Sequence, residues 1–186
     1  LLKFSLLDAG NVKQLRDLLK DKRRYKEYSN ITSVTEECLV LLKREIERYL
    51  PRTIAFKDIP GFHEDTLKKL GQSGLSKTDD VYELVKKPAL RTKFAEQVGI
   101  SDAEALKVAQ FVDLSRIMWS TPSFIMLLYT SGYRSLNDVL TADPQKMHEE
   151  LSAVNGKECI LKSTLRPVDI ELFIRYAEDV PDEMEW

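Results

Sequence analysis

The fold is decided by two similar stretches of sequence, IPGFHEDTLKKLGQSGLSKTDDV at residues 59–81 and IMWSTPSFIMLLYTSGYRSLNDV at residues 117–139. They align without a gap at an offset of 58 residues, and their apolar positions coincide. The glycines at Gly74 and Gly132 coincide as well. Self-similarity at a fixed spacing indicates a repeat architecture, in which each short unit must bury its apolar face against a neighbour.

Each copy predicts short helices separated by tight turns. Leu and Ile recur at spacings of three or four, which places them on one helical face. The glycine after this face predicts a helix end, because glycine adopts the left-handed conformation at little cost. The polar stretches Ser76–Asp79 and Ser135–Asp138 then predict the start of a further helix, as Ser101 does later. No sustained strand-like alternation occurs, so we expect an all-α chain.

A fainter third copy lies near the start, where residues 6–10 resemble residues 70–74. Leu1 would then lie inside the second helix of a hairpin, and we expect the full gene product to extend further toward the N-terminus. The stretch VKQLRDLLKDKRRYKEY after Asn11 predicts one helical stripe. Ser33 with Glu36 has a capping-box pattern. The helix that follows should end at Pro51.

The stretch Ile59-Pro60-Gly61-Phe62, followed by Leu67 and Leu70 and then Gly74-Leu75, resembles a helix-hairpin-helix motif. Residues 59–181 also resemble the bacterial domain-of-unknown-function family numbered 4332. The matching features are LRTKFAEQVGIS, DLSRI, LLYTSGYRSLNDV, LSAVN and IRYAEDVP, in that order. This resemblance implies stacked, SAM-like helix-hairpin-helix units and a protein- or nucleic-acid-binding role. It implies no definite activity.

The repeats divide the chain into predicted parts: a degenerate, N-terminally incomplete unit at 1–50, helix-hairpin-helix units at 51–115 and 116–181, and an acidic tail at 182–186. The tail is either a contact peptide anchored by Trp186 or a frayed terminus. We expect the frayed terminus, since chain ends are commonly poorly ordered.

Two observations favour a protein partner over DNA. The second glycine of a DNA-binding hairpin would fall at His63, and the second loop, Met118–Pro122, has no glycine. Side chains there obstruct the approach of a phosphate to backbone N–H groups. Residues 51–186 hold 17 Lys and Arg against 22 acidic residues, a net charge of −5. A duplex-binding surface generally carries excess positive charge.

The candidate partner-binding residues are therefore those of the two hairpin loops: Pro60, Gly61, Phe62, His63, Trp119, Ser120 and Thr121. Trp119 is the strongest of them. It either anchors a partner or stacks on a base, or its ring packs beneath the loop. We expect His63 to be an ordinary exposed residue at a helix start.

The alternative function is nucleic-acid binding through the hairpin loops and a basic patch. The first 50 residues have a net charge of +3. The patch consists of Lys13, Arg16, Lys20, Lys22, Arg23, Arg24 and Lys26. Four of these residues (13, 16, 20 and 23) should share one helical face, which can also be simply a solvated surface.

The sequence offers no enzyme signature. It lacks a glycine-rich phosphate loop, a nucleophile elbow and a zinc-protease motif, and its two histidines and two cysteines are dispersed. Asp113 and Arg116 are candidate catalytic residues, but their i, i+3 spacing is that of an ordinary helical ion pair. We expect the pair to fix one unit against the next. We therefore predict a non-catalytic chain that needs no metal or cofactor. We also expect a cytoplasmic location, because the start shows no signal-peptide pattern and the cysteine usage fits a reducing compartment. We expect no membrane partner, because no apolar run approaches the ~20 residues of a membrane span.

Overall fold

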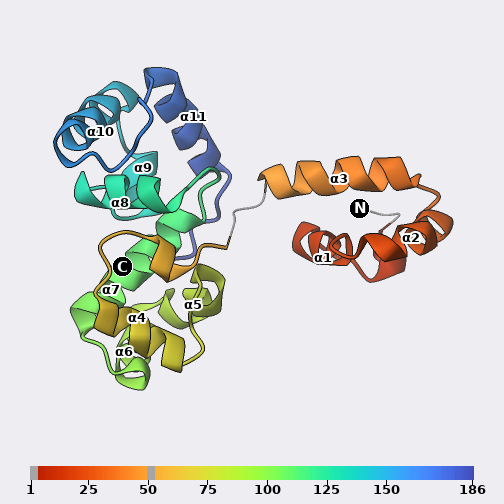
Figure 1. Cartoon of the computed structure of the whole chain (residues 1–186), viewed down its shortest axis with the longest axis horizontal. Coiled ribbons are helices and arrows are strands. Elements are labelled where there is room, and N and C mark those ends of the chain that lie inside the picture. Colours follow the sequence, from red (N-terminus) through yellow and green to blue (C-terminus); the bar gives the residue numbers. More distant parts are fainter. Residues whose placement is uncertain (1–3, 50–52) are drawn as a thin grey trace. The chain divides into compact units, whose positions relative to one another are not determined.

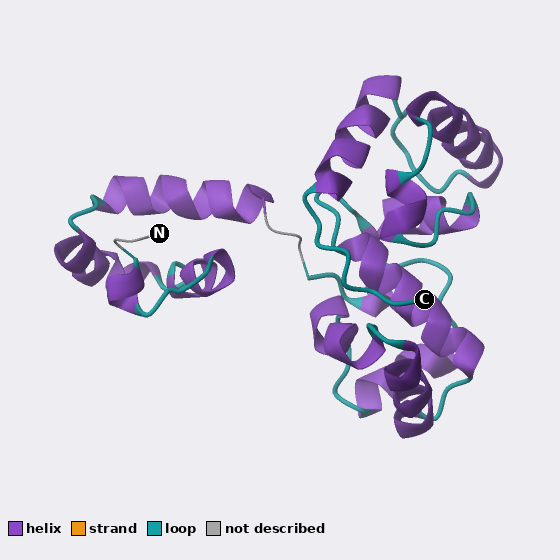
Figure 2. Cartoon of the chain, turned by 180° about the vertical axis from the view of Figure 1, so that it is seen from behind, coloured by secondary structure: helices purple, strands orange, loops and turns teal. Residues whose placement is uncertain are grey.

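The computed structural model describes residues 4–49 and 53–186, and its regular elements are helices (Figure 1, Figure 2). Within these residues the extended pairing is limited to an isolated bridge between Ala55 and Lys77. The predicted all-α class is confirmed. The chain divides into two compact units, Leu1–Pro51 and Arg52–Trp186.

The first unit contains short helices around its own small core. Its elements are η1 (Ser5–Leu7), α1 (Val12–Leu18), η2 (Lys22–Arg24), α2 (Tyr25–Thr32) and α3 (Glu36–Tyr49). Leu19, Tyr28 and Leu39 are fully buried in this core. The predicted positions of Leu1 and of the helix end at Pro51 lie outside the described residues.

Two sequence predictions for this unit are wrong. The single helix after Asn11 is broken at Leu19–Asp21, because Asp21 accepts a hydrogen bond from the Arg23 backbone and caps a new helical turn. This break lets Leu19 and Tyr25 enter the same core. Ser33 ends α2 in the left-handed conformation (φ 54°) and does not cap α3.

The second unit has one continuous core. Its elements are η3 (Phe56–Asp58), α4 (Glu64–Gln72), α5 (Thr78–Val85), α6 (Pro88–Val98), α7 (Asp102–Ser115), α8 (Pro122–Thr130), α9 (Leu136–Leu140), α10 (Pro144–Glu158) and α11 (Pro167–Glu178). Helix α7 packs against α5, α6 and α8, with α4–α6 on one side of it and α8–α11 on the other (Figure 1). The segments 51–115 and 116–181 thus contribute to the same core.

Helices and turns of the second unit recur at the same offset of 58 residues as the sequence. Helices α4 and α8 begin 58 residues apart, as do α5 and α9. The turn after α4 is closed by the Leu75 N–H donating to the Leu70 carbonyl at 2.9 Å. The turn after α8 is closed by the equivalent bond from Tyr133 to Leu128, also 2.9 Å. Gly61 (φ 83°) has its counterpart in Trp119 (φ 70°).

The segment Pro181–Trp186 packs against α5 and the start of α6, so the predicted frayed terminus is wrong. Met184 is 5% exposed and belongs to the core of the second unit. The Glu185 backbone N–H donates to the Lys86 carbonyl at 2.8 Å. An apolar anchor and a backbone hydrogen bond hold this segment, although its composition is acidic.

Candidate functional site

The first predicted hairpin loop (Pro60–His63, called loop 1) joins η3 to α4, and Phe62 is its partly buried residue. The Phe62 ring packs edge-on against Phe56 and Phe111, with centroids 5.5 and 5.0 Å away. Pro60 and His63 are exposed, and the His63 side chain makes no capping hydrogen bond. The Gly61 backbone has a φ of 83°, a conformation that favours glycine, and a Cβ at this position would lie 2.9 Å from Met126 Cε.

Lys107 closes this loop from α7, and sequence reasoning missed it. Its Nζ donates to the Gly61 carbonyl at 2.7 Å and lies 5.5–5.6 Å from the ring centroids of Phe62, Phe111 and Tyr129. Burial lowers the pKa of the Lys107 ammonium. The i, i+4 spacing to Phe111 was the one available sequence signal. The Lys107 ammonium therefore holds loop 1 through the Gly61 carbonyl.

The second predicted hairpin loop (Met118–Thr121, called loop 2) joins α7 to α8 and presents one large side chain to solvent. Ser120 Oγ donates to the Leu114 carbonyl at 2.7 Å. Thr121 Oγ1 accepts from the Phe124 backbone at 3.3 Å and caps α8. Trp119 is 50% exposed, and its ring meets Tyr176 edge-on at 4.7 Å. Of the two alternatives for Trp119, the structure shows the exposed one, with one side of the ring supported.

A small apolar cavity of about 180 Å³ lies beside Trp119. Its walls come from loop 2, α8, the α10–α11 connection and α11. The lining residues are Trp119, Thr121, Phe124, Leu161, Ser163, Leu165, Asp169, Ile170 and Phe173. Pockets for drug-sized ligands span roughly 300–1,000 Å³. This cavity is smaller, and it suits a single large apolar side chain.

The basic patch does not form the predicted helical face. Lys13 and Arg16 lie on α1, whereas Arg23 lies on η2 beyond the break at Leu19–Asp21. Capping by Asp21 redirects the chain between them. The two halves therefore do not continue one helical surface.

Acidic neighbours pair with several cations of the patch. Lys20 Nζ lies 2.7 Å from Asp17, and Arg24 lies 3.0 Å from Glu27. Arg23 lies 2.9 Å from the carboxylate of its capping residue. The hydrogen bond from Lys20 lowers the pKa of Asp17. Within the described residues, the exposed cations without an ion pair in this patch are Lys13, Lys22 and Lys26.

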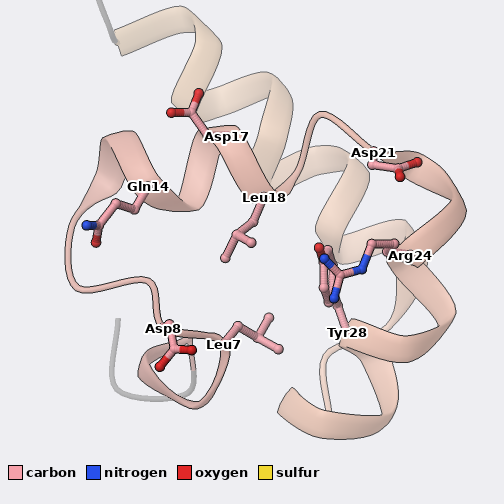
Figure 3. Close-up of a pocket in the computed structure, with 8 residues that line it drawn as sticks. All are labelled: Leu7, Asp8, Gln14, Asp17, Leu18, Asp21, Arg24 and Tyr28. Carbon is pink, nitrogen blue, oxygen red and sulfur yellow. The ribbon is translucent and has the colours of Figure 1, made fainter.

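A cleft of about 590 Å³ in the first unit is lined by two of these acidic residues, Asp17 and Asp21 (Figure 3). Leu7 and Leu18 point into it, Asp17 and Asp21 lie at its rim, and Arg24 stacks over Tyr28 on one side. The remaining lining residues are Asp8 and Gln14. Three carboxylates against one guanidinium make this cleft a poor site for a phosphate.

Asp113 and Arg116 form the predicted ion pair, and their contacts fit a junction. Asp113, with a side chain 1% exposed, accepts from Arg116 at 2.9 Å and from the Leu136 backbone at 2.7 Å. Arg116 also donates to the Pro181 carbonyl. Burial raises the pKa of Asp113. The pair links α7 to the start of α9 and to the C-terminal segment.

The described residues bring no three His, Cys, Asp or Glu side chains into a metal-binding group. His148 Nε2 lies 3.0 Å from the Leu165 carbonyl, far along the chain from the exposed His63. In the same residues, no helix combines the length and apolarity of a bilayer span.

No curated protein and no solved structure matches the chain. One family model does match it, over residues 60–179, which is more than half of the chain. The match covers both hairpin loops, the cavity beside Trp119 and the Asp113–Arg116 pair. The chain therefore belongs to the family described as Domain of unknown function (DUF4332).

Proposed function

We propose that this chain is a non-catalytic binding module that recognises a protein partner. The observation that carries the proposal is the half-exposed Trp119 beside an apolar cavity of about 180 Å³. The partner would be a short segment that inserts one large apolar side chain, such as Leu or Phe, between Trp119 and Phe173. Tryptophan is enriched among residues that dominate binding energy at protein interfaces.

The backbone of Trp119 supports this proposal. Its φ of 70° is an outlier for a bulky residue and costs roughly 1–2 kcal/mol. Strained residues of this kind persist where the surroundings fix them, and they cluster at functional sites. The equivalent position in loop 1 is Gly61, which adopts the same conformation without that cost. The second loop therefore carries a strained tryptophan where glycine would be favourable.

The chemistry of the surroundings supports a protein over a nucleic acid. Residues 51–186 carry a net charge of −5, which disfavours a polyanion near the cavity. In the first unit, three cations of the basic patch are neutralised by Asp17, Asp21 and Glu27. A peptide anchored by apolar burial needs none of these cations.

Nucleic-acid binding is the alternative function. Its specific support is that the N–H groups of Gly61 and Phe62 donate no hydrogen bond within the described residues. The exposed Lys13, Lys22 and Lys26 add positive charge. Such binding would weaken steeply as salt rises, because each neutralised phosphate releases counterions.

Selection of short random peptides on the intact chain tests the proposal. The counter-selection uses Trp119→Ala, and Leu106→Ala is the matched control, because Leu106 is an exposed apolar residue of α7 outside the cavity. We expect enriched peptides that share one large apolar residue and bind at least tenfold more weakly to Trp119→Ala, a loss of about 1.4 kcal/mol. The control should bind like the native chain.

A second variant, Ser163→Trp, fills the cavity and leaves Trp119 in place. It should also abolish binding of the selected peptides. Peptides that bind both variants as well as the native chain would place the binding site elsewhere and overturn the proposal.

A further inference from the structure

The segment Pro181–Trp186 occupies a second surface of the same unit, on α5 and α6. The Tyr82 hydroxyl donates to the Glu183 carboxylate, and Lys87 Nζ lies 2.7 Å from Glu185. The Arg91 guanidinium stacks over the Trp186 ring, 5.1 Å from its centroid. Tyr82, Lys87 and Arg91 thus each contact one residue of the segment.

The backbone of the segment is held as well. Arg116 donates to the Pro181 carbonyl, and the Glu185 N–H donates to the Lys86 carbonyl at 2.8 Å. Between these two points Met184 inserts its side chain, which is 5% exposed. The segment is thus an apolar anchor flanked by two glutamates, which face cations and a phenol.

We propose that the surface formed by Tyr82 of α5, Lys87 and Arg91 at the start of α6, and Arg116 at the end of α7 is a binding site for an acidic peptide with a Met-sized anchor in a partner protein, and that residues 181–186 block it in cis. This site is distinct from the cavity beside Trp119. The charge complementarity and the buried anchor are both seen in the contacts of the chain's own segment. The ligand chemistry follows from that occupant: acidic residues on both sides of a linear apolar side chain.

The exposed contacts of the segment contribute little to its attachment. Its ion pair with Lys87 joins side chains that are both more than half exposed, and such pairs contribute about 0–1 kcal/mol. Trp186 is 47% exposed. Met184 is the one buried hydrophobic anchor of the segment.

The covalent link to α11 compensates for this weakness. A short linker raises the effective concentration of the segment to the mM range. Because the site is occupied in cis, the same peptide added in trans should bind a released site with a Kd below about 1 mM.

The test measures the anisotropy of a fluorescent PDEMEW peptide with variants of the full chain. Met184→Asp releases the segment, since a carboxylate in an apolar pocket is strongly disfavoured. We expect saturable binding to Met184→Asp and at least twofold weaker apparent binding to the native chain. Adding Lys87→Glu to the released chain should weaken binding at least threefold. The matched charge reversal at the exposed Lys93 on α6 should leave it unchanged.

A chain ending at Val180 provides a second released form. Saturable binding to either form, with competition by the cis segment, supports the proposal. Equal binding to native and released chains overturns it, as does no binding to released chains that still unfold cooperatively. If both released forms lose cooperative unfolding, residues 181–186 are a structural element of the core, and the proposal fails as well.

Discussion

Replacement of Trp119 by glycine and, in a matched variant, by alanine separates the cost of its backbone from the contribution of its ring. Both variants lose the same ring. A tryptophan side chain buries about 200 Å² when enclosed, and Trp119 is 50% exposed. About 100 Å² is then lost, worth about 2.5 kcal/mol at ~25 cal/mol per Å². The edge-on contact with Tyr176 adds about 1 kcal/mol. We expect Trp119→Ala to lower the free energy of unfolding by about 3–4 kcal/mol.

The glycine variant should be the more stable of the two. Alanine retains the Cβ that makes φ 70° unfavourable, by roughly 1–2 kcal/mol, whereas glycine does not. Glycine also makes the unfolded chain more flexible, which costs about 0.4–1 kcal/mol. The difference leaves Trp119→Gly more stable than Trp119→Ala by roughly 0.5–1 kcal/mol.

Urea denaturation of the two variants measures this difference, provided that their m-values agree. The control is the same pair of substitutions at Leu106, an exposed position inside α7. There glycine should be the less stable by about 1 kcal/mol, because helix interiors disfavour it. If the glycine variant is also the less stable at position 119, the loop is not strained, and the Trp119 backbone gives no support to the proposed function.

Three further perturbations test contacts of the second unit. Gly61→Ala and Gly74→Ala should both destabilise, because both glycines have a positive φ, and Gly61→Ala should cost slightly more because its Cβ would lie 2.9 Å from the end of the Met126 side chain. Thermal melts of both variants check this order. The Thr66 hydroxyl donates a hydrogen bond to the Glu104 carboxylate, and this bond lowers the pKa of Glu104 to about 2. The ionised carboxylate therefore stabilises the folded chain above the unfolded pKa, and this stabilisation is lost as the pH falls toward 2. Glu104→Gln should cost about 1–2 kcal/mol at neutral pH, and denaturation across pH should show that deficit shrinking in acid. Burial raises the pKa of Asp113 in the folded chain. The free energy of unfolding therefore falls as the pH rises from the unfolded pKa of this carboxyl through its folded pKa. Asp113→Asn should remove that fall while costing about 3 kcal/mol overall, and an unchanged pH profile would contradict the assignment.

The local signals of the second unit were sufficient to predict many of its elements. Helices α7 and α9 begin after Ser101 and Ser135 as expected, and each start forms a capping box. The glycines at Gly74 and Gly132 end α4 and α8 with matching turns. These features depend on side chains and backbone groups within a few residues of each other, which a single sequence displays directly.

Features that depend on tertiary contacts were missed or mispredicted. The break in the helix after Asn11 brings Leu19 and Tyr25 into one core with Leu39 of α3, a contact that the apolar spacing does not display. The ammonium of Lys107 lies among three rings that come from different segments. The spacing of these residues in the sequence therefore does not predict their contact. Met184 orders an acidic segment that composition alone would leave frayed. In each case the deciding partner lies on another element.

The most direct test of the proposed function is a fluorescence titration of the chain carrying Trp186→Phe, in which Trp119 is the remaining tryptophan. The ligands are a peptide from the selection and a mixed-sequence DNA duplex, each at low and moderate salt. The proposal predicts a saturable blue shift of Trp119 emission with the peptide, with an affinity nearly independent of salt, and no shift with DNA. Peptide binding that leaves the emission unchanged, or DNA binding that shifts it and weakens steeply with salt, would contradict the proposal.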